Sequence, residues 1–517
     1  MKSSYKLAAL CLGALLLRLI LMQVVQHPGI ADPNHYYNMG IRLVNGHGFT
    51  IDYIWQYALP PESIVHPEEH WMPLAAVLAA APMALFGIGV HSALIPFVVL
   101  GSLLPLLSYW AARQLDLSES AALFAGAATA VLPELVLNSV RTDTTVPAAF
   151  FTGVSLLLLT HGLRRGAWWS FVISGAAAGL AYLTRSDALL IAPMLAVVLL
   201  VHALWRRDAP LHLRWVWLMP LVALLVVSPW LARNLNAFGT PTTPESGSMF
   251  FFTHHDDHYA YEREFSLETL LASQTPAEIL GKRVFEALAA VKLMYTTLDV
   301  VLPVAVVGGL ILLLAARDRR RLLALSPALI LLLGAFVAYT VFLPYKAQAG
   351  SFKKIYLSLV PLLIPLGAYA FERAIGDRRL RLGAMSLTLI FTGANAVELV
   401  RADANFTVTY LRSMEQIAEH AADLPDINGD DALVLMAQDP YMLRYVGIQS
   451  VMYPYEPRDT IYAVAGRYGV DYLLMPPNRP ALNALYDGTE TDPRFVPAHD
   501  IPGTQYRFFA VMLESGS

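Results

Sequence analysis

The stretch LAALCLGALLLRLILMQVVQHPGIADPNHYY, residues 7–37, begins with an apolar run and continues directly into polar and aromatic residues. The apolar part, Leu7 to Val25, is close to the ~20 residues that a helix needs to cross a bilayer. It is too long for the apolar region of a signal peptide, and no small-residue cleavage site follows it. We therefore expect a retained first membrane span.

The composition extends this expectation to most of the chain. The 517 residues are 56% hydrophobic and 15% charged, with a mean hydropathy of +0.50, whereas soluble domains carry about 25% charged residues. Similar apolar runs recur and predict a mainly α, multi-pass membrane protein with about 11 spans plus interfacial helices. The runs are 7–25, 91–112, 121–137, 146–163, 169–183, 188–204, 215–231, 300–316, 322–343, 355–371 and 382–400.

Two features of the composition exclude other classes. The formal net charge of −4 gives no indication of a nucleic-acid partner. The one cysteine, Cys11, falls inside the first apolar run, so no intrachain disulfide can form. We expect Cys11 to be a small packing residue.

The positive charges decide the sidedness. The run PLAAVLAAAPMALFG, residues 73–87, is short and contains Pro82, so we interpret it as interfacial or re-entrant. The Lys and Arg clusters then share one side, which the positive-inside rule assigns to the cytoplasm together with the N-terminus. We thus predict a plasma-membrane protein whose connections 26–72, 138–145, 232–299 and 344–354 lie outside. The clusters comprise Lys2, Lys6, Arg113, Arg164, Arg165, Arg206, Arg207, Arg214, Arg317, Arg319, Arg320, Arg321, Arg373 and Arg378 to Arg381.

The last part of the chain has a different pattern. Short β-type runs (ALVLMA from 432, DYLLMP from 471, YRFFAVML from 506) are separated by helix-like stretches such as DTIYAVAGRYGV from 459. This pattern predicts a small extracytoplasmic α/β domain at 401–517, after a transmembrane module at 1–400. No G-x-G-x-x-G follows any of these strands, so no nucleotide site is proposed there.

Asp32 is the first candidate for catalysis. It lies at the outer mouth of the first span and precedes Pro33. Partial burial would raise the pKa of such a carboxylate, which suits a general base that deprotonates a hydroxyl. Alternatively, Asp32 caps the helix PNHYYNMGIRLV, with Pro33 at the first helical position. The two readings are compatible.

Further charged residues lie at the other outer corners. Arg141 and Asp143 occur in SVRTDTTVPAAFF, where Asp143 also suits a helix start. Two acids from separate corners can serve one site or bind a divalent cation. The remaining cations are Arg185, Arg233, Lys346, Lys353 and Lys354. Cations on the outer face need compensation, either by a phosphate group of a substrate or by anionic lipid headgroups.

Two other features admit a structural interpretation. HHDDH, at 254–258, lacks the helical spacing and the H-E-x-x-H order of metal sites. We interpret it as an exposed or substrate-covering loop and predict no metal site there. Arg18 is the main charge inside a span, where it can mark an ion path. An arginine on a long stem more simply pairs locally or reaches the interface.

At these positions the chain resembles the polytopic GT-C glycosyltransferases of family 39, in the group that contains protein O-mannosyltransferases and the aminoarabinose transferases of lipid A. The resemblance covers roughly the first 400 residues. It rests on the order of five motifs: D-x-x-x-Y-Y-x5-L-x-x-G-x-G-F at 32–49, RTDT at 141–144, LTRSDALLIAP at 183–193, PWLARNLNAFGTP at 229–241 and GSFKKIYLSLVPLLIPLGAYAFE at 350–372.

The resemblance implies a GT-C helical bundle and a defined reaction. A hexosyl or pentosyl group moves from a polyprenyl-phosphate donor to a hydroxyl of a lipid, glycan or protein acceptor, by one inverting displacement. Asp32 would be the base and Asp143 a second catalytic acid. The substrate-binding residues implied are His35, Tyr36, His70, Arg141, Arg185, Arg233, Lys346, Lys353 and Lys354. Cationic side chains suffice to stabilise the leaving phosphate, so no cofactor is required and a divalent cation is optional.

The chain departs from the family at two points. Pro33 replaces the second acid that often follows the first aspartate, and EEHWMPL at 68–74 replaces a Lys-Pro-Pro-like segment, where His70 can substitute. The alternatives to a transferase are a transporter or flippase of lipid-linked envelope material and a non-catalytic envelope scaffold. A flippase needs polar stripes inside its spans, and these spans are nearly free of charge.

Overall fold

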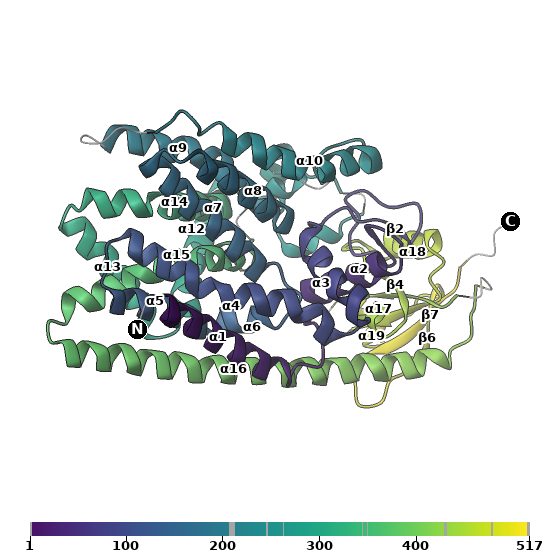
Figure 1. Cartoon of the computed structure of the whole chain (residues 1–517). Coiled ribbons are helices and arrows are strands. Elements are labelled where there is room, and N and C mark those ends of the chain that lie inside the picture. The colour runs from purple at the N-terminus through teal and green to yellow at the C-terminus, as the bar shows by residue number, and fades with distance from the viewer. Residues whose placement is uncertain are drawn as a thin grey trace. The chain divides into compact units, whose positions relative to one another are not determined.

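The computed structural model describes residues 3–205, 212–243, 247–261, 263–343, 345–348, 350–428, 432–476 and 479–513. The chain forms two compact units (Figure 1). The first unit contains residues 1–28, 71–241 and 274–404, and the second contains residues 29–70, 242–273 and 405–517. The predicted division at 400/401 is close to the last of these borders, but it assigned segments 29–70 and 242–273 to the transmembrane module, whereas their contacts place them in the second unit.

The first unit is a helical bundle. Its elements are α1 (Ser3–Met22), α3 (Leu74–Phe86), α4 (Val90–Gln114), α5 (Glu119–Val131), α6 (Pro133–Ser139), α7 (Thr145–Arg165), α8 (Trp168–Thr184), η1 (Ser186–Leu190), α9 (Ile191–Trp205), α10 (Leu218–Phe238), α12 (Pro276–Thr297), α13 (Val301–Ala315), α14 (Arg319–Val337), the π-helical turn η5 (Ala338–Phe342), α15 (Ser351–Ala374) and the first part of α16 (Arg378–Ala422).

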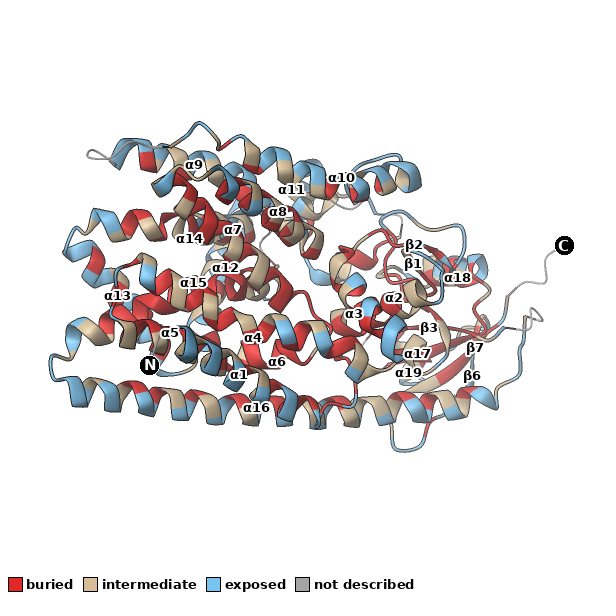
Figure 2. Ribbon diagram, viewed as in Figure 1, coloured by how far each residue is buried: buried red, intermediate tan, exposed pale blue. Residues whose placement is uncertain are grey.

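Helix α15 is the centre of this bundle. It packs against α4, α5, α7, α13 and α14, and almost all of it is buried (Figure 2). Small residues allow neighbouring backbones to approach closely. A Cβ on Gly309 of α13 would lie 2.0 Å from the carbonyl oxygen of Leu366 in α15, and one on Gly175 of α8 would lie 2.3 Å from that of Met219 in α10.

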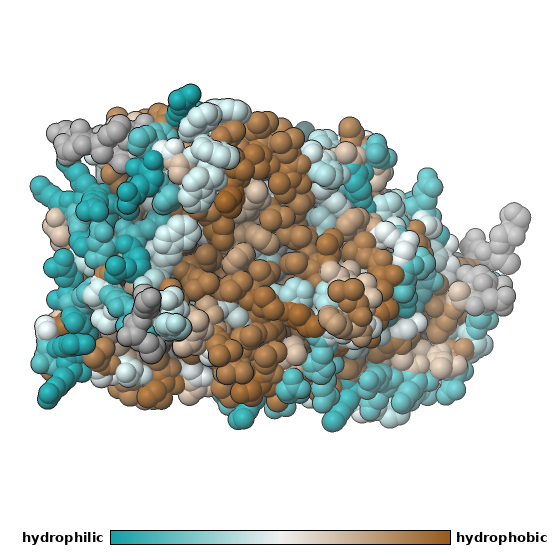
Figure 3. Space-filling view, in the orientation of Figure 1, coloured by the Kyte–Doolittle hydropathy of each residue, from teal (hydrophilic) through white to brown (hydrophobic). Residues whose placement is uncertain are grey.

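The outer surface of the helices remains apolar. In the view of Figure 3, hydrophobic residues form a broad band over the bundle, and hydrophilic residues gather at its left end. Exposed leucine, valine, isoleucine and phenylalanine side chains occur on α1, α10, α13 and α16. An apolar exterior of this extent is typical of helices that contact lipid. The chain is thus a multi-pass membrane protein, as the sequence predicts.

Among its described residues, the structure has fewer candidate spans than the sequence predicts. Eight helices in the described residues are long and apolar enough to cross a membrane, or ten if each bent helix pair counts as one span, whereas the sequence suggested about eleven. The run 121–137 bends by 54° between α5 and α6, and the run 300–316 belongs to the pair α12 and α13, bent by 111°. The run 169–183 becomes α8, with 17 residues, which is shorter than the usual ~20.

Helix α3 contains most of the short apolar run at 73–87. Its 13 residues extend about 20 Å, less than the ~30 Å of a hydrocarbon core. The interfacial or re-entrant placement of this run stays a prediction.

Basic residues gather at one end of the first unit. Lys6 pairs with Glu119 at 2.9 Å. Arg164 donates to the carbonyl oxygens of Gln114 and Arg320 at 3.0 and 3.2 Å, and Arg321 donates to that of Leu115 at 2.6 Å. These contacts join the ends of α4, α7 and α14, so these clusters lie at one end of the bundle. Lys2, Arg206 and Arg207 lie outside the described residues, and the cytoplasmic placement of this end stays a prediction.

The second unit is built around a small sheet. It contains α2 (Asp32–Val44), β1 (Thr50–Ile51), β2 (His66–Pro67), η3 (Ser248–Phe251), η4 (His255–Tyr259), α11 (Leu267–Ser273), the end of α16, β3 (Val434–Ala437), α17 (Pro440–Tyr445), β4 (Gln449–Met452), α18 (Arg458–Arg467), β5 (Tyr472–Met475), α19 (Asn483–Tyr486), β6 (Phe495–Asp500) and β7 (Arg507–Val511). The three predicted β-runs are confirmed as β3, β5 and β7, and the helix-like run as α18.

The sheet has the strand order β4-β3-β5-β7-β6. Strands β4, β3 and β5 are parallel, whereas β7 and β6 are added antiparallel. The segments 29–70 and 242–273 attach to this sheet through the backbone. Ile54 donates to the carbonyl oxygen of Ser450 at 3.1 Å and accepts from the backbone N–H of Met452 at 2.8 Å, and Tyr455 donates to the carbonyl oxygen of Tyr259 at 2.9 Å. These bonds explain why the two loops belong to the second unit.

Candidate functional site

The end of α15 that carries Lys354 bears a compact network of charges. The Nζ atom of Lys354 lies 2.6 Å from Oδ2 of Asp143, and the Asp143 side chain is only 3% exposed. Oδ1 of Asp143 accepts the backbone N–H of Thr145 at 2.7 Å. Asp143 therefore supports the first turn of α7, as its sequence context suggested, and also holds the ammonium group of Lys354.

A second ion pair adjoins this one. Arg185 follows α8 and pairs with Asp187, whose carboxylate also accepts the hydroxyl of Tyr339 at 2.7 Å. The guanidinium of Arg185 further reaches Oγ1 of Thr144 and the carbonyl oxygen of Ser351, each at 3.4 Å. The corners before α7, after α8 and at the start of α15 thus meet through Arg185.

Two further ion pairs involve predicted cations. Lys353 pairs with Glu134 at 2.5 Å, and Arg141 pairs with Asp403 of α16. Each of the four cations at these corners therefore has a carboxylate partner within the first unit. This finding corrects the expectation that a substrate phosphate or lipid headgroups must compensate them. A phosphate would instead share these cations with existing acids.

The structure places Lys346 and Arg233 against aromatic rings. Lys346 lies in the turn before α15, with its Nζ 4.8 Å from the ring centre of Tyr345. Arg233, near the end of α10, lies over the rings of Trp230 and Phe238 at 4.8 and 5.1 Å. Both are cation–π contacts, which keep the positive charge and orient the side chain.

Asp32 lies in the second unit, in the first turn of α2. The cap position is occupied by Ala31, so the prediction that Asp32 itself is the N-cap is wrong by one position. Ala31 has φ 62° and ψ −126°, a conformation that residues with a Cβ rarely adopt. Backbone strain of this kind clusters at functional positions, where the surrounding structure maintains it.

His35, one helical turn after Asp32, belongs to a buried polar group. Its Nε2 lies 3.1 Å from Oε2 of Glu68, with both side chains 0% exposed. Its Nδ1 forms a short hydrogen bond with the hydroxyl of Tyr53, and its ring contacts that of Tyr36 edge-on at 5.6 Å. The sequence named His35 and Tyr36 but missed Glu68 and Tyr53, whose positions only the loop conformation reveals.

His70 and the HHDDH segment meet in an aromatic cluster. The ring of His70 lies 4.8 Å from that of Trp55 and 5.8 Å from that of His258. Asp257 accepts the backbone N–H groups of Thr253 and His254, so this acid shapes the loop. In the described part of the chain, no group of three His, Cys, Asp or Glu side chains could hold a metal ion. A divalent cation stays an untested expectation.

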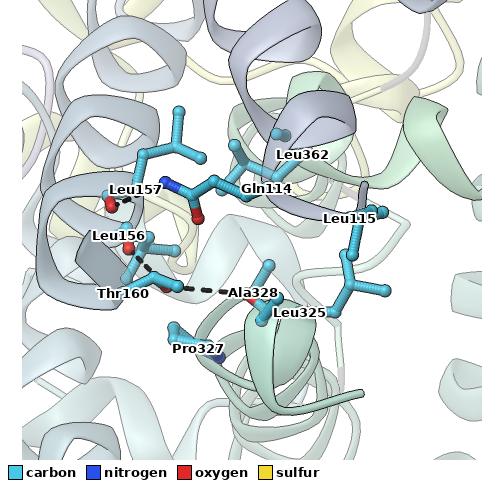
Figure 4. A pocket seen from close by; sticks show the side chains of 11 residues that line it. Gln114, Leu115, Leu156, Leu157, Thr160, Leu325, Pro327, Ala328 and Leu362 are labelled. Carbon is cyan, nitrogen blue, oxygen red and sulfur yellow. Dashed lines mark hydrogen bonds between the residues drawn. The ribbon is translucent and has the colours of Figure 1, made fainter. Parts of the chain in front are cut away.

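A pocket inside the first unit is too small to be a substrate site. It lies between α4, α7, α14 and α15 and has a volume of about 20 Å³ (Figure 4). Gln114 donates to the carbonyl oxygen of Leu157, and Thr160 donates to that of Leu156. The other lining residues are apolar. The space suits a single water molecule, for which roughly 10–15 Å³ suffices.

Comparisons with known proteins agree with this architecture. Residues 65–232 match the family model described as dolichyl-phosphate-mannose-protein mannosyltransferase. The fold is similar to that of ArnT from Cupriavidus metallidurans bound to undecaprenyl phosphate, with a TM-score of 0.60 and 18% identity over 99% of this chain and 98% of that chain. The comparison with curated proteins finds no match.

A second similar structure is the oligosaccharyltransferase AglB from Archaeoglobus fulgidus in complex with an inhibitory peptide and a dolichol-phosphate. The TM-score is 0.56 at 13% identity, over 91% of this chain and 69% of that chain. The likeness to both structures confirms the fold predicted from the sequence: a GT-C membrane bundle with a small C-terminal sheet region.

Proposed function

We propose that this GT-C chain is a membrane glycosyltransferase that moves a sugar from a polyprenyl-phosphate donor to a hydroxyl acceptor on the extracytoplasmic side. The family match over 65–232 and the fold shared with ArnT and AglB support a glycosyltransferase. Both of those structures contain a polyprenyl phosphate, which supports a lipid-linked donor.

The observation that carries the proposal is the Asp143–Lys354–Arg185 network. It lies at the start of α15, whereas the basic clusters lie around the other end of the bundle. Helix α15, with 24 residues, extends about 36 Å, enough to cross a bilayer. If the basic end is cytoplasmic, as the positive-inside rule requires, the network lies at the outer membrane surface. A lipid-linked donor presents its phosphate at that depth.

The reaction that we propose is an inverting displacement. We assign the proton of the acceptor hydroxyl to Asp32, as general base, while the acceptor oxygen forms its bond to the anomeric carbon. The bond between this carbon and the phosphate oxygen breaks at the same time, and polyprenyl phosphate leaves with the electron pair. Lys354 and Arg185 stabilise the developing charge on the phosphate. Asp143 and Asp187 orient these two cations.

The flippase alternative receives no support from the bundle. Arg18, the main charged residue inside a span, donates hydrogen bonds to Ser139 and to the carbonyl oxygens of Ala14 and Ala130, all of which lie close to it in the bundle. The pocket of Figure 4 is lined mostly by apolar residues and, at about 20 Å³, is too small for a charged headgroup. A flippase instead needs a polar path along its spans.

Two measurements test the proposal. Mass spectrometry of lipid extracts from cells with and without the protein should show a polyprenyl-phosphate sugar that accumulates only without it. With this donor, the purified Asp32→Asn variant should bind the donor normally and lose transfer by at least about 10²-fold. Full turnover by Asp32→Asn would refute the assignment of the base, and unchanged lipid profiles would refute the donor.

A matched control uses another acid of the second unit. Asp471 directly precedes β5 and accepts the backbone N–H groups of Ile427, Asn428 and Val434. Asp471→Asn should lower stability while it leaves the transfer rate of the folded protein unchanged. Loss of transfer in both variants would indicate a general structural defect.

A further inference from the structure

Arg479 is a buried cation in the second unit with little compensation. Arg479 is only 4% exposed. One guanidinium nitrogen donates to the carbonyl oxygen of Tyr453 at 2.8 Å, whereas Nε is buried without a hydrogen-bond partner. In the described part of the chain, no carboxylate forms an ion pair with Arg479. Buried charges are normally paired, so this one requires an explanation.

Aromatic rings surround the guanidinium of Arg479. It lies 6.0, 5.8 and 5.6 Å from the ring centres of Tyr259, Tyr453 and Tyr455. Cation–π contacts of this kind orient a guanidinium but leave its charge and N–H groups available to an anion. Three tyrosine rings therefore hold Arg479 in a fixed position without neutralising it.

Its neighbour Arg263 differs in this respect. Arg263 pairs with Asp257 at 3.2 Å and with Glu456 at 3.0 Å, so two carboxylates compensate it. Arg479 interacts electrostatically with the carboxylate of Asp256. A hydrogen bond from His255 lowers the pKa of Asp256 against the opposing effect of burial, and the charge of Arg479 adds to this lowering. This influence acts at a distance, because no hydrogen bond or ion pair joins Asp256 to Arg479 in the described part of the chain.

An open pocket of about 470 Å³ adjoins the two arginines. This volume lies within the range of small-molecule sites, about 300–1,000 Å³. Its walls combine flat apolar surfaces with hydrogen-bonding groups, a combination that suits the ring face and the hydroxyls of a sugar. The lining residues are Arg263, Pro454, Tyr455, Glu456, Pro457, Arg479, Pro480 and Ala481.

We propose that Arg479 and the surrounding tyrosines form a binding site for an anionic saccharide, one that carries a carboxylate or a phosphate group. The guanidinium binds the anionic group through paired N–H donors. The ring of Tyr455 and the prolines contact the sugar. Glu456, which accepts from Arg263, is placed at the same wall for a hydroxyl group.

The site has a link to the candidate base. Burial raises the pKa of Tyr259, and the carboxylates of Asp256, Asp439 and Asp32 raise it further. Asp32 is therefore within electrostatic range of a ring that contacts Arg479. If the proposed function holds, on which this step rests, the anionic saccharide is part of the acceptor.

The test uses the full chain purified in detergent, with glucuronic acid and glucose 6-phosphate as probes and glucose as the neutral control. Saturation-transfer NMR measures binding without any donor or transfer. Arg479→Gln should weaken binding of the anionic probes by about tenfold or more. Arg507→Gln is the matched control, because Arg507 pairs with the exposed Asp500 at 2.6 Å. This variant should bind the probes as the native protein does. The probe that loses more affinity identifies the anionic group.

A second variant covers the case in which Arg479→Gln fails to fold. Tyr455 is half-exposed, and Tyr455→Ala should weaken binding of both anionic probes several-fold at an unchanged melting temperature. Equal binding of glucose and the anionic probes, or native affinity in Arg479→Gln or in folded Tyr455→Ala, would overturn the inference. Asp32→Asn should still bind the probes. Full transfer by Asp32→Asn would contradict the proposed base without affecting this site, whereas native probe binding by Arg479→Gln would contradict this site without affecting the proposed base.

Discussion

The ammonium group of Lys354 lies 2.6 Å from a carboxylate oxygen of Asp143, although 211 residues separate the two in the sequence. The contact joins the first turn of α15 to the residue that precedes Thr144 and α7. Lys353, the next residue on α15, pairs with Glu134 instead. Two adjacent lysines thus have different partners, which allows their roles to be separated.

Lys354→Gln should reduce transfer from the lipid-linked donor by about 10²- to 10³-fold, because the leaving phosphate loses one of its two proposed cations. Lys353→Gln should reduce transfer by less than about fivefold. The Lys353 side chain, which pairs with Glu134, is 35% exposed, and exposed ion pairs contribute little. Steady-state rates at saturating donor decide between them. Equal losses in the two variants would contradict the special role of Lys354.

The Asp143–Lys354 pair should also contribute to stability. A double-mutant cycle with Asp143→Asn and Lys354→Gln should give a coupling of about 1–3 kcal/mol, between the values of exposed and buried pairs. The double variant should be less destabilised than the sum of the single variants, because neither charge is then left alone. Denaturant unfolding in mixed micelles measures this coupling. Additive losses would show that the two side chains do not interact.

Arg18 should stabilise the bend between α5 and α6. Its guanidinium donates to Ser139 at 3.0 Å and to the carbonyl oxygen of Ala130, near the end of α5, at 3.0 Å. Arg18→Met should therefore cost about 2 kcal/mol or more, because these buried acceptors lose their donor. Lys6→Gln, on the same helix, breaks only a partly exposed pair and should cost less than about 1 kcal/mol. Melting temperatures in detergent compare the two, and a fully stable Arg18→Met would refute the role.

Adjacent glycines of α13 offer a test of the helix packing. Gly309→Ala should destabilise the bundle by about 1–3 kcal/mol. The added methyl group would lie 2.0 Å from the carbonyl oxygen of Leu366, so α13 would have to move away from α15. Nothing lies within 4 Å of the corresponding position at Gly308. Gly308→Ala should thus be neutral or stabilising by up to about 1 kcal/mol, since alanine favours helix. The opposite order of melting temperatures would contradict this interface.

The pair of His66 and Glu69 predicts a pH-dependent contribution to stability. Their side chains are 3.0 Å apart and nearly inaccessible. Burial opposes the imidazolium, but the Glu69 carboxylate and the carbonyl of Ile64 outweigh it, so the pKa of His66 is raised above 6.5. A raised folded pKa means that the contribution is complete below the unfolded value of about 6.5 and is lost as the pH rises through the folded value.

The difference in melting temperature between the native protein and His66→Gln should therefore be larger at acidic pH and shrink at alkaline pH. The comparison with His66→Gln removes the effects of other titrating groups that both proteins share. A difference that grows with pH would show that His66 is neutral in the folded protein.

The sequence alone determined the class of protein and its local elements. Long apolar runs have few stable alternatives to membrane helices, since backbone polar groups in lipid must bond within the segment. The tail could be identified as α/β for a similar local reason, because β-branched and aromatic runs favour extended backbone. The short strands β4 and β6 were not predicted: β4 has only four residues and begins shortly after α17, and only one of the six residues of β6 is buried.

The tertiary structure decided which residues meet. The sequence identified Asp143, Arg185 and Lys354 as candidates but could not show that Lys354 pairs with Asp143. It also did not identify Glu134 and Asp403, which are the partners of Lys353 and Arg141. It also counted the loops 29–70 and 242–273 within the transmembrane module 1–400, whereas their hydrogen bonds to Ser450, Met452 and Tyr455 attach them to the sheet. Residue type and spacing act within a few turns of chain, whereas an ion pair or a buried arginine depends on distances that only the packed backbone sets.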